Sequence, residues 1–512
     1  MKRKRLPKVL LALFLIASII ITGCSNTEKN SAEPEKGGNS EEPYEVAMSF
    51  ITLGQTPKDL QMVQDEINKI AIPETNTKVK LVPFSIAEYG QKLNLMLSSG
   101  EKLDLALTGV FTNGLGQFVN KGQLLKLDDL FAEYGADIKK AEDIAIAGGY
   151  YNGELYAIPS EEKMGRQQGF GARTDLIQKY GIDTTGIKTY EDMDAIFKTI
   201  HDGEGSSFYP YALSGSGAGS SSFGYFNLVD SLGSTLASGG LLDGGQGSTK
   251  IVNVFATPEY KKHLEWMRKW YSAGYIPKDA AASTETPTDL IKSGRAFGGG
   301  LSVEPGMAEN LTRDAGMPIT SIALTKPYAV TNSYQISMWS IPITSKNPEA
   351  AMRFLNLTYK DERIINLLSN GIEGKHYVKT DESMIIKYPE GVSVQTTGYN
   401  NPLGLYGDKM KKYAWAPTEA KIFDELKVFN EEVSKNGASK TLGYVFNSDS
   451  VKAEFAAVAN VMTEYQSSLE TGSVDIDNTL PKFLEKLKSA GIDKIIAENQ
   501  KQLDAWFKEN GK

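Results

Sequence analysis

The chain has 512 residues, of which 41% are hydrophobic and 10% aromatic, and it carries 63 acidic against 55 basic residues. This composition is typical of a globular protein, and the length predicts two or more lobes rather than one core. The acidic balance argues against nucleic acid as a partner, because phosphate binding needs a basic surface, although acidity that serves only solubility fits as well.

The first 24 residues have the pattern of an export signal. Basic residues at 2–5 precede the short apolar run 11–22, which is too short and wrongly flanked for a stable membrane span. Ile21-Thr22-Gly23-Cys24 resembles a bacterial lipobox, in which the cysteine is acylated and becomes the mature N-terminus. We therefore expect a lipoprotein signal peptide at 1–23 and a palmitate-type anchor on Cys24, at the outer face of the cell membrane. The alternative is a buried thiol that happens to follow an apolar run.

Cys24 is the only cysteine, so no intrachain disulfide can form and an ordinary core must stabilise the protein. Removing the five basic residues of 1–23 leaves 50 basic against 63 acidic residues, a net charge of −13. Residues 25–43 contain one alanine and no larger apolar side chain. We expect residues 24–43 to be a disordered tether, since such a segment cannot offset its ordering entropy by burial.

The first elements alternate between strand and helix. Hydrophobic spacing predicts strands at 44–50, 79–84 and 103–107, with helices from Asp59 and at 87–97 between them. This alternation predicts a parallel sheet with crossover helices, in which ligands bind beyond the carboxyl ends of the strands. Those ends are 51–53 and 108–111.

The rest of the chain predicts a second α/β unit followed by helices. Thr189 and Asn347 are each expected to cap a helix, and Pro348 takes the first position of the second one. Pro258 is expected to open a further helix. The stretch 291–300 is expected to run from a helix end into a strand or turn, and 333–342 to form a strand. The last hundred residues show helical periodicity.

No motif indicates a cofactor or a metal. The glycine-rich stretches 214–219 and 247–250 lack nucleotide-binding spacing and are interpreted as flexible connections. The three histidines form no ligand-like cluster. Asp475-Ile476-Asp477-Asn478 resembles half a calcium loop but lacks its glycine and terminal glutamate, so we favour a cap for a helix beginning near Pro481.

Three motifs in order carry a family resemblance. Tyr151–Pro159, Gly294-Arg295-Ala296 and Ser345–Ala351 together resemble the extracellular solute-binding proteins of ABC importers, family 1. The stretches 371–377 and 485–494 are similar to the larger lipoprotein members from Gram-positive bacteria. The resemblance covers nearly all of 44–512.

The resemblance implies an α/β fold with two periplasmic-binding-protein-like lobes (type II), hinged by several crossovers, and a helical C-terminal region. We expect lobe 1 to comprise 44–160 plus 300–341, and lobe 2 to comprise 165–298 plus 345–512. Crossovers are expected near 160–165, 298–300 and 341–344. The implied function is a membrane-anchored, monomeric substrate-binding component that captures a carbohydrate, in particular an oligosaccharide, and delivers it to the permease subunits.

The ligand residues are expected around the cleft, where aromatic rings cover sugar faces and polar side chains bond hydroxyls. By the family's order, one wall holds Gln55, Thr108 and Phe111. The first crossover supplies Glu161, Glu162, Arg166 and Gln167. The other lobe supplies Tyr225, Tyr399, Asn400 and Trp415. Glu304 is a weaker candidate that an exposed surface acid explains as well, and burial under the following helix is the alternative for Trp415.

Two other functions stay open at this point. A cell-surface polysaccharide-degrading enzyme would need two carboxylates about 5–10 Å apart, and a chance pair such as Glu161 and Glu304 cannot be told from a real one by sequence. No Ser/His/Asp order or metal motif supports it, so no catalytic residue is assigned and an enzyme is not expected. The other is a sugar sensor or adhesin that uses the same clamp without transport.

Overall fold

The computed structural model describes residues 42–109, 112, 114–215, 221–401 and 403–511, and residues from Pro43 onward form one compact unit. The expected signal peptide, Cys24, residues 24–41 of the expected tether and Phe111 lie outside the described residues.

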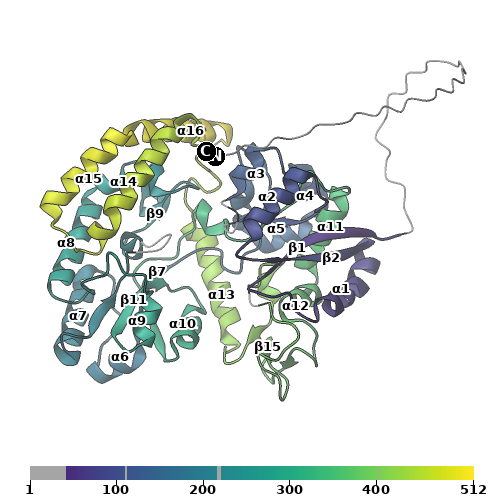
Figure 1. Ribbon diagram of the computed structural model, residues 1–512, viewed down its shortest axis with the longest axis horizontal. Coiled ribbons are helices and arrows are strands. Elements are labelled where there is room, and N and C mark those ends of the chain that lie inside the picture. Colours follow the sequence, from purple (N-terminus) through teal and green to yellow (C-terminus); the bar gives the residue numbers. More distant parts are fainter. Residues whose placement is uncertain (1–41, 110–111, 113, 216–220, 402, 512) are drawn as a thin grey trace, which may run out of the picture. The chain divides into compact units, whose positions relative to one another are not determined.

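The first group of elements is built on strand β1 (Tyr44–Thr52), which pairs in parallel with β2 (Thr77–Ser85) across helix α1 (Leu60–Thr75) (Figure 1). This is the predicted crossover unit. The predicted third strand also lies beside β1, since Leu105 forms a parallel bridge with Met48. Beyond it the arrangement is antiparallel, because β13 (Met338–Ser340) pairs with both β3 (Ala106–Leu107) and β6 (Ile158–Pro159). The other elements of the group are α2 (Tyr89–Ser99), α3 (Leu115–Asn120), α4 (Asp128–Tyr134), α5 (Ala136–Glu142), the hairpin β4 (Tyr150–Tyr151) with β5 (Glu154–Leu155), α11 (Pro348–Lys360) and α12 (Glu362–Asn370).

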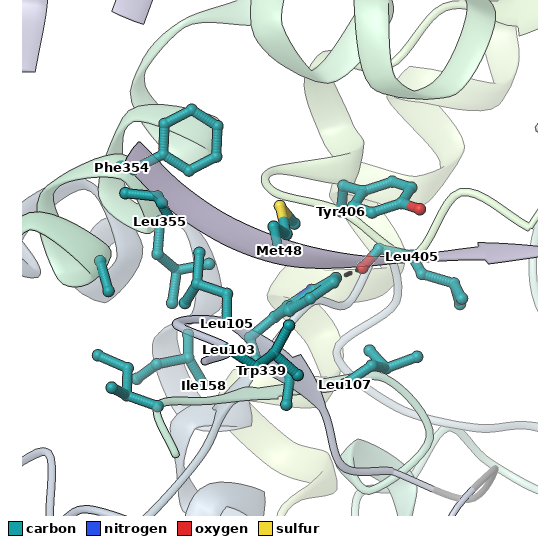
Figure 2. Packing of buried hydrophobic residues seen from close by; sticks show 14 of the residues in the cluster. Met48, Leu103, Leu105, Leu107, Ile158, Trp339, Phe354, Leu355, Leu405 and Tyr406 are labelled. Carbon is teal, nitrogen blue, oxygen red and sulfur yellow. Dashed lines mark hydrogen bonds between the residues drawn. The ribbon is translucent and has the colours of Figure 1, made fainter. Parts of the chain in front are cut away.

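One hydrophobic core holds this group together. Figure 2 shows Trp339 of β13 beside Met48 of β1, Leu105 and Tyr406, with its indole N–H donating to the Leu405 carbonyl oxygen at 2.8 Å. Trp339 is fully buried, so this hydrogen bond satisfies the one polar atom of a large core side chain.

The second group is built on a sheet of order β12-β7-β11-β8, comprising β7 (Gln168–Arg173), β8 (Tyr209–Ala212), β11 (Ala296–Ser302) and β12 (Ile319–Ala323). Strand β11 runs parallel to β8 and antiparallel to β7. The helices α6 (Thr174–Tyr180), α7 (Tyr190–Glu204), α9 (Pro287–Lys292) and α10 (Met307–Ala315) belong to it. Its core packs aromatic rings edge to face, as in the pairs Phe170–Tyr211 and Phe197–Trp270.

The C-terminal region is helical, as predicted. Helices α14 (Lys452–Glu470), α15 (Ile476–Ala490) and α16 (Ile492–Glu509) lie together in Figure 1 and share a core with α8 (Pro258–Ser272), β9 (Val229–Asp230) and β10 (Leu241–Leu242). Asp475 caps α15, since its carboxylate accepts from the Asn478 N–H at 2.9 Å, although the helix begins earlier than expected. The remaining elements are β14 (Val378–Lys379), β15 (Ile385–Lys387), β16 (Ala414–Trp415) and α13 (Lys421–Glu432).

The structure divides the chain differently from the expected lobes. Gly298–Gly300 does not cross between groups but lies inside β11, where a Cβ on Gly298 would meet the Gly171 carbonyl oxygen at 2.3 Å. These glycines therefore permit close strand packing. Strand β12, expected in lobe 1, pairs with β7 in the second sheet. The chain returns to the first group between 324 and 337, so α11, α12 and Tyr406, expected in lobe 2, pack in the same core as β1. Residues 341–344 lie within the first group, beside Leu103 and Gln123.

Candidate functional site

Three segments connect the first group of elements to the second group and the C-terminal region. Residues 160–167 join β6 to β7, residues 324–337 join β12 to β13, and α13 with residues 433–447 leads from β16 to α14. The first of these agrees with the crossover predicted near 160–165. We call these the first, second and third connecting segments.

The three segments meet in one small joint. Its hydrophobic centre contains Met164 from the first segment, Tyr334 from the second and Val433 from the third. The Tyr334 hydroxyl donates to the Met164 carbonyl oxygen at 2.5 Å. Backbone hydrogen bonds join Arg166 with Tyr328 in both directions, and Ala329 with 437 and 439. All three connections of the first group therefore pass through this joint.

A buried pair of carboxylates is formed by Glu161 on the first segment and Glu142 at the end of α5. The Glu161 N–H donates to both carboxylate oxygens of Glu142, at 3.1 and 3.2 Å, and Glu161 Oε2 is 3.9 Å from Arg166 Nη2. Burial raises the pKa of both carboxyl groups, and the charge of Glu161 raises that of Glu142 further. Burial also lowers the pKa of the neighbouring Lys409 amine. Glu161 is 7% exposed, and its Oε1 has no hydrogen-bond partner among the described residues.

The other residues predicted on this segment gather at the same joint and bond within the protein. The Gln167 N–H donates to Glu304 Oε1 at 3.0 Å, so two residues predicted separately are in contact, and Glu304 is buried rather than exposed. The Arg166 guanidinium donates to the Ser333 carbonyl oxygen at 2.6 Å. Glu162 is half-buried, with its carboxylate 4.0 Å from the amine of the adjacent lysine. Of these side chains, Glu161 keeps an unused acceptor.

Two predicted ligand residues belong to the core of the first group. Thr108 is fully buried and shares a hydrogen bond with the Ser340 hydroxyl at 2.7 Å. Tyr399 is 2% exposed and donates to the Leu368 carbonyl oxygen at 2.7 Å, and it lies in the first group rather than opposite it. A ligand therefore cannot reach either side chain in this structure. Gln55 and Asn400 are exposed.

The two remaining aromatic candidates are half-buried. Tyr225 lies against β11, where its ring occupies the space that a Cβ on Gly300 would need. The Trp415 indole N–H donates to Asn370 Oδ1 at 3.0 Å, and its ring centroid lies 4.4 Å from that of Tyr388. Trp415 is thus held in a fixed orientation with part of its surface accessible, which suits a platform for a sugar face.

A cavity of about 800 Å³ opens beyond the carboxyl end of β8. It is lined by residues within 213–215 and 221–237 and by one face of α14. At its edge the buried Glu470 carboxylate accepts hydrogen bonds from the Ser221 hydroxyl at 2.8 Å, the Gln466 amide at 2.9 Å and the Tyr260 hydroxyl at 3.2 Å. Burial raises the pKa of Glu470. The position agrees with the rule that open α/β sheets bind ligands beyond the carboxyl ends of their strands.

Ser222 and His263 are in contact beside this cavity, but the histidine donates a hydrogen bond to the serine hydroxyl and so does not activate it as a nucleophile. The Ser222 hydroxyl donates to the Glu470 carbonyl oxygen at 2.9 Å and lies 2.7 Å from His263 Nε2. The hydroxyl must then accept from Nε2–H, which leaves Nδ1 to accept from the Tyr190 hydroxyl at 3.0 Å. Burial lowers the pKa of His263 to about 3, so the ring is neutral. A histidine that already donates to the serine cannot take its proton.

Among the described residues, no group of three or more His, Cys, Asp or Glu side chains could hold a metal ion. In the same part of the chain, no helix has both the length and the apolar character needed to cross a bilayer.

Sequence reasoning missed the cavity because it interpreted its glycine- and serine-rich stretch as a flexible connection. A usable signal was present in the charge pattern. From Gly205 to Leu242 the sequence contains a single charged residue, Asp230, in a chain where 23% of residues are charged.

Comparison with known proteins identifies the family. Residues 65–371 match the family model described as bacterial extracellular solute-binding protein, and residues 440–508 match a domain of unknown function, DUF3502. The chain belongs to the bacterial extracellular solute-binding protein family. A carbohydrate ABC transporter substrate-binding protein from Streptococcus pneumoniae serotype 4 is 30% identical, with 97% of this chain and 98% of that protein covered. The polygalacturonan/rhamnogalacturonan-binding protein YtcQ from Bacillus subtilis is 22% identical, with 96% and 97% covered.

Solved structures of this family have the same fold. The N-glycan transport solute-binding protein NgtS from Streptococcus pneumoniae is 28% identical and superposes with a TM-score of 0.78, covering 91% of this chain and 100% of that one. Its complex with Man5GlcNAc gives a TM-score of 0.64, with 91% and 99% covered. The predicted α/β, two-lobed fold is confirmed, and the family assignment made from the ordered motifs is confirmed as well.

Proposed function

We propose that this protein is the substrate-binding component of a carbohydrate ABC importer, which takes an oligosaccharide between its two groups of elements and presents it to permease subunits. The observation that carries the proposal is the full-length relation to a carbohydrate ABC transporter substrate-binding protein, together with the similarity to NgtS, whose complexes contain Man1GlcNAc and Man5GlcNAc. The joint of three segments supports a hinged mechanism, since a ligand that contacts both groups favours their approach.

We also propose that the protein performs no chemistry on its ligand. The hydrogen bonding of Ser222 and His263 argues against a serine nucleophile, and the Glu142 and Glu304 carboxylates accept hydrogen bonds from backbone N–H groups. The mature chain would act as a monomer, held at the outer face of the cell membrane by an acylated Cys24. Replacing Cys24 with alanine should release the protein from the membrane fraction while leaving ligand binding unchanged.

The direct test is a thermal-shift and calorimetric titration of the protein with Man5GlcNAc, maltopentaose and hexagalacturonate, followed by an assay for new reducing ends. A ligand at 100 times its dissociation constant should stabilise the protein by about 2.7 kcal/mol without being cleaved. New reducing ends, or no binding to any of the three sugars, would contradict the proposal.

Trp415 provides a second test with a matched control. Trp415→Ala should weaken oligosaccharide binding, because the half-buried ring is held by Asn370 with part of its surface accessible. Trp266→Ala removes another partly buried tryptophan, which packs on the core of the second group. It should leave affinity unchanged, and equal losses in both variants would argue against a role for Trp415 in the site.

A further inference from the structure

We propose that the cavity of about 800 Å³ lined by residues within 213–215 and 221–237 and by α14 binds an uncharged, hydroxyl-rich segment of the ligand, so that the protein selects neutral glycans and rejects uronates. This inference rests on the proposed carbohydrate function and adds a location and a charge class to it.

The lining of the cavity lacks positive charge. Its described residues include no lysine, arginine or histidine, and Glu470 is its one acidic side chain. A uronate entering the cavity would lose its hydration and meet no cation. Carboxylate ligands are held by Arg or Lys because an unpaired charge in a desolvated site is costly. The cavity therefore disfavours acidic sugars and tolerates neutral ones.

Nearby acids do not reverse this conclusion. The Glu470 carboxylate is 3% exposed and is occupied by hydroxyl and amide donors from Ser221, Gln466 and Tyr260. Asp230, on β9, is fully buried and accepts from the Ser439 and Thr441 hydroxyls, both at 2.6 Å. Both carboxylates serve the internal structure, so they leave the lining to hydroxyl, amide and aliphatic groups.

The lining has the two kinds of surface that a pyranose presents. Hydroxyl groups come from Ser231 and Thr235 on one side and from Thr463 on α14. Between them lie the aliphatic side chains of Leu236 and Met462. The Ser231 and Thr463 hydroxyls donate to the carbonyl oxygens of Ser234 and Ala459, so they can accept hydrogen bonds from sugar hydroxyls. The C–H faces of the ring can pack on the aliphatic side chains.

The cavity is also connected to the joint. The Asn332 amide, on the second connecting segment, donates to the carbonyl oxygen of the lining residue Ser234 at 2.9 Å. Asn332 Oδ1 is buried without a hydrogen-bond partner among the described residues. A ligand in the cavity thus lies one hydrogen bond away from a segment about which the two groups bend.

Helix α14 offers a matched pair of variants that test this site. Thr463→Trp places a large ring in the cavity from an exposed position, whereas Asn460→Trp adds the same ring at an exposed position of α14 that does not line the cavity. Ala459→Phe, one turn from Thr463, is a second blocking variant. Circular dichroism and thermal unfolding of each variant would establish that it is folded.

Calorimetric titrations with Man5GlcNAc, maltopentaose and hexagalacturonate distinguish the outcomes. We expect at least one neutral sugar to bind, and hexagalacturonate to bind at least about 100-fold more weakly. Folded Thr463→Trp or Ala459→Phe should weaken the neutral sugar at least about tenfold, with Asn460→Trp within about twofold of the unmodified protein.

Each contrary result has a separate meaning. Hexagalacturonate binding as tightly as a neutral sugar would overturn the charge selection. Unchanged affinity in both folded blocking variants would overturn the location while leaving the carbohydrate function standing. Failure of all three sugars to bind the unmodified protein would refute the proposed function itself, and this inference with it.

Discussion

Gly165 offers a direct test of the joint at which the three connecting segments meet. It is buried on the first segment, and a Cβ at this position would lie 2.6 Å from the Tyr328 carbonyl oxygen of the second segment and 2.7 Å from Val433 Cγ1 of the third. Because backbone and a branched side chain must both shift, Gly165→Ala should destabilise the protein by about 1–3 kcal/mol, in the range measured for overpacked cores. That loss must exceed the gain of about 0.4–1 kcal/mol that Gly→Ala gives by restricting the unfolded chain.

Gly186→Ala is the matched control, since Gly186 is exposed and a Cβ there meets no atom within 4 Å. Both variants should be measured by urea unfolding, with the midpoints and slopes compared with those of the unmodified protein. We expect the control to be unchanged or slightly more stable. A Gly165→Ala protein within about 0.5 kcal/mol of the control would show that the three segments do not pack as tightly as described, and the joint would lose its place in the mechanism.

Three further predictions concern the joint and the buried histidine. Tyr334→Phe removes the hydroxyl that donates to the Met164 carbonyl oxygen and should cost about 0.5–1.5 kcal/mol in urea unfolding; no loss would mean that this hydrogen bond adds no stability. Because the Glu161 pKa is raised by burial, the ionised form is the disfavoured one, so Glu161→Gln should be more stable than the unmodified protein at pH 8, and this advantage should shrink as the pH falls through the raised pKa. A pH-independent difference would argue that Glu161 titrates normally. Burial lowers the pKa of His263 to about 3 in the folded protein. Between about pH 6.5 and pH 3, the imidazole is therefore protonated only in the unfolded chain, and the protein becomes less stable as the pH is lowered. Between pH 6.5 and 5.0 the unmodified protein should therefore lose about 1.6 kcal/mol more than His263→Gln, and identical losses would refute the assignment.

Local chemistry made much of the secondary structure predictable. The Thr189 side chain and the carboxylate three residues on form a capping box, and Asn347 caps a helix with proline at its first position, as their sequence patterns indicate. The parallel β1–α1–β2 unit follows from alternation of strand and helix periods. The family could be recognised for a related reason, because its ordered motifs are short contiguous stretches whose residues need no distant partner to be identified.

The site was less predictable, because whether a side chain is accessible depends on elements far away in the sequence. Thr108 and Tyr399 have the right chemistry for a sugar, yet β13 and α12 bury them. Glu161 lies on the first connecting segment, but its contact with Glu142 joins two segments that the sequence does not mark as neighbours.

The amino-acid sequence alone determined the export-signal pattern, the composition, the helix caps and the alternation of strands and helices, since each depends on residues close together in the chain. Tertiary structure alone decided that Gly298–Gly300 lies inside a strand, that three segments share one joint, and that residues within 221–237 line a cavity together with α14. The physical reason is that packing and desolvation depend on every neighbour in space, and most of those neighbours are distant in sequence.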